Sequence, residues 1–281
     1  MKFINTPSII FLMDVQYSAQ DKKRGIQIPT SLTPELAELI GILVGDGNIY
    51  LRKNKKYEIR ICGHLSEDKE HHQTIIASLF NKVFNVKNLV ETTHPYKCAR
   101  YTGISSKAIT TFLVYNVGLP SGRKLDAKQI IPLAILTADI TIKSAFLRGL
   151  ADTDFCLRFK RRKDIKNPYH SDPYIVGRFG NNQKMINDLL YLIKSLGIRA
   201  YIGEERKENK INLVVTASGK KNLLKWMKTI CFNNYKHTTK YDIWDTYGFC
   251  PPYTTLAQRD KILNGDIRLL QRYTREMEKH I

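Results

Sequence analysis

Apolar residues follow two different spacings along this chain, and the two spacings alternate in a repeated order. Two stretches, 34–46 and 141–154, have the dense apolar content of helices that are buried on much of their surface. Each is followed by two segments with the period-two alternation of half-buried strands. These strand-like segments are 48–53, 57–62, 156–163 and 174–179. Further helical patterns are at 67–83, 107–117, 183–196 and 220–230, with a clear second hairpin at 199–215. The pattern predicts one unit, helix–hairpin–helix–hairpin–helix, that occurs twice.

The two helical stretches are also similar residue by residue. When Gly41 is aligned with Gly149, Asp46 meets Asp154, and in both copies the aspartate follows the glycine by five residues. A glycine inside a helix costs about 1 kcal/mol relative to alanine. We therefore expect Gly41 and Gly149 to lie where the two helices touch. Either Asp139 or Thr141 is placed to cap the second helix.

This duplication predicts an α+β protein with two pseudo-symmetric αββαββα halves joined by a linker. The first 31 residues and the last 31 lie outside the repeated unit. The expected segments are an N-terminal arm (1–31), a first half (32–119), a linker (120–137), a second half (138–250) and a basic C-terminal tail (251–281).

Composition narrows the range of partners. Forty-five basic side chains against 26 acidic ones give a net charge of +19 and a pI near 9.7. Such a surplus favours a polyanionic partner, with nucleic acid the first candidate and an anionic membrane surface the second. No run approaches the roughly 18 apolar residues of a membrane span. The five cysteines are scattered and form no CxxC pair, which predicts a reduced, intracellular protein that is not secreted.

Residues 39–47 (LIGILVGDG) and 147–155 (LRGLADTDF) resemble the signature of the LAGLIDADG homing endonucleases in their two-repeat, single-chain form. The resemblance covers roughly residues 32–248. It implies two signature helices packed at a pseudo-twofold axis, and two curved antiparallel sheets that straddle the major groove of a long pseudo-palindromic DNA target. It also implies a monomer that uses Mg²⁺ (or Mn²⁺) to cut both strands and leaves short 3′ overhangs.

In this resemblance Asp46 and Asp154 are the catalytic residues and hold the metal, with Gly45 and Thr153 beside them. The chain departs from the signature at Val44, where an acid is common, and at Phe155, which replaces the final glycine of the second copy. A bulky side chain at Phe155 is expected to alter how the strand leaves the helix.

Carboxylates at helix C-termini suit the chemistry of phosphodiester hydrolysis. Mg²⁺ prefers oxygen ligands and needs only one or two protein carboxylates. A helix C-terminus adds unpaired carbonyls and a partial negative charge, which favour a cation. A divalent ion offsets the charge that develops on the phosphate and lowers the pKa of an attacking water.

Further site residues are expected around this pair. Lys107 and Lys220, which begin corresponding helices, are candidates for a supporting catalytic role, with Gln183, Asn181 and His64 as weaker ones. His71 and His72 are interpreted as surface residues. Basic residues of the first hairpin in each half are expected to bind DNA, arginine at base edges and lysine at phosphates. These residues are Arg52, Lys53, Lys55, Arg60, Arg158, Lys160, Arg162 and Arg178.

Two alternatives to a homing endonuclease stay open. One is an RNA-splicing maturase of the same family, with intron RNA as a partner, and the other is a DNA-binding regulator that does not cleave. Retention of both Asp46 and Asp154 argues against the regulator. The tail, with Arg259, Arg268, Arg272 and Arg275, either clamps DNA or packs as an amphipathic helix.

Overall fold

The computed structural model describes residues 14–52, 56–124, 127, 129–161, 169–207 and 210–278. Three of the expected DNA-binding residues, Lys53, Lys55 and Arg162, lie outside these residues.

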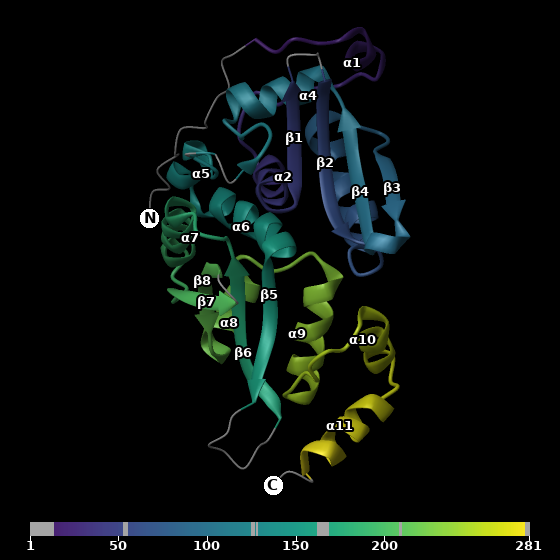
Figure 1. Cartoon of the computed structure of the whole chain (residues 1–281), viewed down its shortest axis with the longest axis vertical. Helices are drawn as coiled ribbons and strands as arrows, with labels where there is room; N and C mark the ends of the chain where they lie inside the picture. Colours follow the sequence, from purple (N-terminus) through teal and green to yellow (C-terminus); the bar gives the residue numbers. More distant parts are fainter. Residues whose placement is uncertain are drawn as a thin grey trace, which may run out of the picture.

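The two halves share one order of main elements, helix, two strands, helix, two strands and helix (Figure 1), and the first half also contains three short π or 3₁₀ helical segments. The first half comprises α2 (Pro34–Gly45), β1 (Gly47–Arg52), β2 (Lys56–His64), η1 (His71–Ile76), α3 (Ala77–Phe84), β3 (Val90–His94), η2 (Pro95–Lys97), β4 (Ala99–Ser105), α4 (Lys107–Thr111) and η3 (Phe112–Asn116). The second half comprises α6 (Ile140–Asp154), β5 (Phe155–Arg161), β6 (His170–Arg178), α7 (Gln183–Ser195), β7 (Tyr201–Lys207), β8 (Lys210–Ser218) and α8 (Lys220–Thr229). The predicted α+β class with two αββαββα halves is confirmed.

Each half forms one four-stranded antiparallel sheet, in the order β1-β2-β4-β3 and β5-β6-β8-β7. The order is the same because each half pairs its two hairpins through their second strands. One side of each sheet is covered by helices and carries the apolar residues of the core, among them Ile59, Ile61, Leu157 and Ile175. The other side carries the alternate, more polar residues of the strands.

Helices α2 and α6 lie side by side between the halves (Figure 1). Thr33 caps α2 by accepting a hydrogen bond from the Leu36 amide at 3.2 Å. Asp139, rather than Thr141, caps α6, and its Oδ1 accepts from the amides of Thr141 and Ile142 at 2.8 and 3.0 Å.

The two helices touch at their glycines. A Cβ placed on Gly41 would lie 2.1 Å from the carbonyl oxygen of Phe146, and one on Gly149 would lie 2.0 Å from that of Glu38. Glu38 and Phe146 occupy the same position in the two repeats, so the contact is itself pseudo-symmetric. Only a residue without a side chain lets the backbones approach this closely.

Other helices lie outside the repeated unit: α1 (Ala19–Lys23), α5 (Leu133–Thr137), α9 (Tyr235–Tyr247), α10 (Leu256–Leu263) and α11 (Arg268–Glu278). In the part of the chain that the structure describes, no helix has the length and apolar content to cross a membrane.

Candidate active site

Asp46 and Asp154 are delivered to one place by the ends of α2 and α6. Asp46 is the C-cap of α2 and its amide donates to the Ile42 carbonyl, while Asp154 is the last residue of α6. A Cβ on Gly45 would lie 1.9 Å from Thr153 Oγ1 and 3.3 Å from Asp154 Oδ2. The helix ends are therefore in contact, and glycine at position 45 leaves room for the second aspartate.

The environment of the two carboxyls favours their neutral forms. Burial, and then the charge of Asp46, raise the pKa of Asp154 to about 7. Burial also raises the pKa of Asp46, with the charge of Asp68 adding to the effect and Lys236 opposing it. Two carboxylates placed together in a desolvated position resist ionisation unless a cation is near.

Two lysines that sequence reasoning missed supply positive charge at this point. Lys124 donates to the carbonyl of Val44 at 2.8 Å and to that of Gly45, so its ammonium sits on the C-terminal end of α2. Burial lowers its pKa to about 8, an effect that Asp154 and Asp46 oppose. Lys236 binds Asp68 with 2.9 Å between Nζ and Oδ1, and its charge acts on both aspartates.

Lys124 and Lys236 come from comparable places, since each follows the last helix of its half. That position in the repeat was the only signal by which the sequence could have identified them. They lie outside the predicted strands and core helices, where hydrophobic periodicity gives no direction for a side chain.

A buried polar network holds the Lys236 side of the site. Asp152 accepts hydrogen bonds from the amides of Asn233 and Asn234 at 3.0 Å, and His71 Nε2 lies 3.4 Å from Asp152 Oδ2. The Asn234 side chain donates to Asp68 at 2.8 Å. Burial acts to raise the pKa of Asp68, but the Lys236 charge and the Asn234 hydrogen bond hold this pKa below its usual value. The network joins residues of both halves around the aspartates.

The interpretation of His71 and His72 as surface residues is wrong, because each is only 2% exposed. His72 Nδ1 hydrogen-bonds Thr102 Oγ1 at 2.8 Å, and burial lowers its pKa to about 4. The π-helical stretch η1 turns both rings inward, whereas the sequence offered no partner for them nearby.

Lys107 and Lys220 lie away from the aspartates. Lys107 Nζ is 5.8 Å from the ring centre of Tyr57, at the far end of the β1–β2 pair from Asp46. Lys220 Nζ is 5.7 Å from the ring of Trp244, which also stacks on Phe159 in the distal part of β5. The structure does not bring these two lysines to the candidate active site. The backbone amide of His64 donates to Asp68 Oδ2 at 2.8 Å, at the edge of the network around Lys236, and its ring Nδ1 accepts from the Glu67 amide at 3.2 Å. The Gln183 side chain donates to Asn187 at 3.0 Å.

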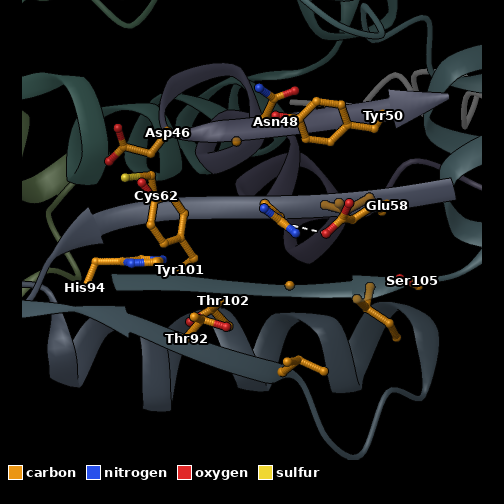
Figure 2. Close-up of a pocket in the computed structure, with 16 residues that line it drawn as sticks. Asp46, Asn48, Tyr50, Glu58, Cys62, Thr92, His94, Tyr101, Thr102 and Ser105 are labelled. Carbon is orange, nitrogen blue, oxygen red and sulfur yellow. Dashed lines mark hydrogen bonds and ion pairs between the residues drawn. The ribbon is translucent and has the colours of Figure 1, made fainter. Parts of the chain in front are cut away.

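The polar face of the first sheet forms a cavity of about 630 Å³ that begins at Asp46 (Figure 2). Asn48, Tyr50 and Arg60 line it, and Arg60 is bound to Glu58. Asp46, Cys62 and Tyr101 lie together at one end of it (Figure 2). The side chain of Arg52 is not among those described.

The polar face of the second sheet carries Arg158 and Lys160, both exposed. Lys160 Nζ lies 4.6 Å from the ring centre of Tyr174 on the neighbouring strand. Arg178 is bound by both carboxylate oxygens of Glu205, with 2.8 Å between Nη2 and Oε1. Arg60 and Arg178 thus each have an acidic partner on the face where base contacts were expected.

The donors at the helix ends fit a hard divalent cation. The carboxylates of Asp46 and Asp154 lie near the backbone carbonyls of Val44 and Gly45, which accept hydrogen bonds from the Lys124 ammonium. Among the described residues no group of three or more His, Cys, Asp or Glu side chains could hold a metal ion. An ion here would depend on two carboxylates, carbonyls and water, which is the ligand set that Mg²⁺ accepts.

No protein-family model and no curated protein matches this chain. Solved structures do match. A point mutant of I-SmaMI has a TM-score of 0.52 at 11% identity, over 88% of this chain and 97% of that one. I-SmaMI is a single-chain LAGLIDADG homing endonuclease. This chain has the fold of the single-chain LAGLIDADG homing endonucleases.

Two further structures with lower TM-scores were solved with DNA. Meganuclease I-SmaMI bound to uncleavable DNA has a TM-score of 0.49 at 13% identity, over 77% of this chain and 90% of that one. The homing endonuclease I-DmoI in complex with DNA and Mn has a TM-score of 0.47 at 18% identity, over 70% of this chain and 96% of that one. At these identities the likeness is one of fold, so the roles of individual residues rest on α2, α6 and their surroundings in this structure.

Proposed function

We propose that this protein is a site-specific DNA endonuclease that hydrolyses one phosphodiester bond in each strand of a double-stranded target. The observation that carries the proposal is the meeting of Asp46 and Asp154 at the paired ends of α2 and α6, between two sheets with open polar faces. The fold match to homing endonucleases supports it.

Mg²⁺ (or Mn²⁺) held by Asp46 and Asp154 would offset charge on the scissile phosphates and make bound water more acidic. The residues of this chain divide the remaining tasks. The ammonium groups of Lys124 and Lys236 stabilise the extra negative charge that develops on the phosphoryl oxygens. The carbonyls of Val44 and Gly45 fix Lys124 in position, and Asp68 fixes Lys236.

The pseudo-twofold arrangement of the two halves also bears on the shape and symmetry of the DNA substrate. Two similar sheets on either side of the aspartates fit a long, pseudo-palindromic duplex, bound by a monomer inside the cell. The two aspartates would cut strands on opposite sides of the axis and leave short 3′ overhangs. The excess of positive charge supplies the sequence-independent part of the affinity.

The test uses the DNA formed by joining the regions that flank the coding segment, together with a randomised duplex library. The wild-type protein with Mg²⁺ should make a double-strand break, and EDTA should stop it. Asp46→Asn or Asp154→Asn should abolish the break while DNA binding survives. Glu35→Gln, an acid at the opposite end of α2, is the matched control and should cut normally.

Double-strand cutting by both asparagine variants at the wild-type rate would overturn the assignment of the site. A wild-type protein that binds duplex DNA but never cleaves it would overturn the proposed activity in favour of a non-cleaving regulator. Binding that is confined to intron RNA would instead identify a maturase.

A further inference from the structure

A second cavity of about 630 Å³ lies beside the polar face of β5, where the chain passes from α9 to α10. Its walls include Arg158, Lys160, Arg161 and Lys240, and among the described residues no Asp or Glu contributes to them. The cavity of the first half differs, because Asp46 and Glu58 both line it. The second cavity therefore has the electrostatic character of a site for phosphate groups.

The outer wall of this cavity is residues 250–254, which we call the rim loop. It is anchored at both ends: the Cys250 amide donates to the His170 carbonyl at 3.2 Å, and the buried Arg259 donates to the Thr254 carbonyl. The rim loop comes after the repeated unit, so the first half has no counterpart in sequence.

Tyr253 is presented by this loop in an unusual way. Its side chain is fully exposed, at 102%, although the loop that carries it is anchored to the protein at both ends. Its backbone has φ of 60°, in the left-handed region that favours glycine. A residue held in this conformation by its surroundings, with a large aromatic ring left in solvent, points to a contact outside the chain.

Three arginines of the C-terminal segment, Arg259, Arg268 and Arg272, have partners within the protein. Arg259 is 1% exposed and binds Glu67 at 3.0 Å and Thr239 at 2.9 Å. Arg268 is bound to Asp266, and Arg272 to Glu276. These three arginines are used in packing or are charge-compensated, which leaves the rim loop as the stronger candidate for contact with an external polyanion.

We propose that the rim loop is an additional DNA-binding element of the second half. In it, Tyr253 packs its ring against the sugars or bases of one strand, and Arg158 and Lys160 bind the phosphates beside it. Aromatic rings stack on nucleotides irrespective of sequence, and phosphate contacts carry no base information. This element therefore strengthens binding on the second half without narrowing the target. The inference rests on the proposed function, since it takes the sheet faces as the DNA-binding surface.

The experiment measures binding of a fluorescently labelled duplex of random sequence, with Ca²⁺ present, as a function of KCl. Tyr253→Ala should weaken binding by about tenfold and leave the salt dependence unchanged, because no charge is removed. Tyr253→Phe should bind as the wild type does. Lys160→Gln should reduce the slope of log affinity against log salt by about 0.9.

Matched controls are Tyr191→Ala and Lys194→Gln on α7, which packs on the helical side of the same sheet. Both should bind DNA normally. Tyr253→Gly separates strain from function: it should raise the melting temperature, since glycine accepts the left-handed backbone, and still weaken binding.

If the wild-type protein binds and cleaves DNA and Tyr253→Ala binds DNA with the same affinity, the proposed role of the rim loop is overturned and the proposed function stands. A wild-type protein that binds no duplex would overturn this inference together with the proposed function. Equal losses in Tyr253→Ala and Tyr191→Ala would assign the effect to folding and would also overturn the rim loop.

Discussion

Phe155 lies directly opposite Gly177 across the β5–β6 pair, whereas the same place in the first half has Gly47 opposite Ile61. The large side chain is on the second strand of the pair in the first half (Ile61) and on the first strand in the second half (Phe155). A Cβ on Gly177 would lie 2.9 Å from the ring of Phe155. Phe155, 3% exposed, fills the space that Gly177 leaves. Its departure from the LAGLIDADG signature is therefore compensated by packing, and Asp154 keeps its place beside Asp46.

Gly177→Ala should destabilise the protein. The added methyl would meet Phe155 and, at 2.6 Å, the ring of Phe179. Overpacking of this kind costs about 1–3 kcal/mol of the free energy of unfolding, which urea denaturation would measure. Gly203→Ala is the control, because its nearest neighbour, Val214 Cγ2, is 3.3 Å away and is the end of a side chain. Equal stability of the two variants would contradict the packing described for Phe155.

Gly149→Ala should also lower the free energy of unfolding, although alanine is the better helix former by about 1 kcal/mol. Its methyl group would meet the backbone of α2 at Glu38, which no rotamer change can relieve. We expect a net loss of about 1–3 kcal/mol, and a loss of cleavage because the helix ends that carry the aspartates separate. Lys194→Ala, on the exposed side of α7, should leave stability within about 0.5 kcal/mol of the wild type. An increase in stability for Gly149→Ala would show that the helices do not touch here.

Lys124→Gln should reduce the rate of cleavage under single-turnover conditions by about a hundredfold, with little change in DNA affinity. Loss of one preorganised group that stabilises transition-state charge has an effect of that order. Lys107→Gln is the comparison, since Lys107 lies against Tyr57 and away from Asp46. It should cut at nearly the wild-type rate. The reverse ranking of the two variants would restore Lys107 as the supporting catalytic residue.

Stability should depend on pH through Asp154. Burial and the Asp46 charge raise its pKa in the folded protein to about 7, above its value in the unfolded chain. The folded state therefore binds the proton more tightly, and this stabilisation is fully present below about pH 4 and is lost as the pH rises through about 7. In EDTA, Asp154→Asn should resemble the wild type at about pH 4 and exceed it at about pH 8 by roughly 1–3 kcal/mol. A difference between the two proteins that stays constant across this range of pH would refute this assignment.

Much of this architecture was readable from the sequence because it depends on local periodicity. The alternation of helical and strand patterns, and the matched positions of Gly41 and Gly149, predict two equivalent halves with a shared helix contact. Asp46 and Asp154 were found by the same alignment. Each is tied to a helix end by its place in the chain, so the meeting of two helices brings the two carboxyls together.

Tertiary structure alone decided the surroundings of that pair. Lys124 and Lys236 reach it from outside the repeated unit, and Asp68, His71 and Asn234 reach it from regions far apart in sequence, where no period constrains a side chain. Lys107 and Lys220 lie apart from the pair for the complementary reason. Their equivalent positions at helix starts are real, but the direction of each sheet places those starts at the end remote from the aspartates. Local pattern determines which elements form and which residues they repeat; the path of the chain between elements determines which side chains meet.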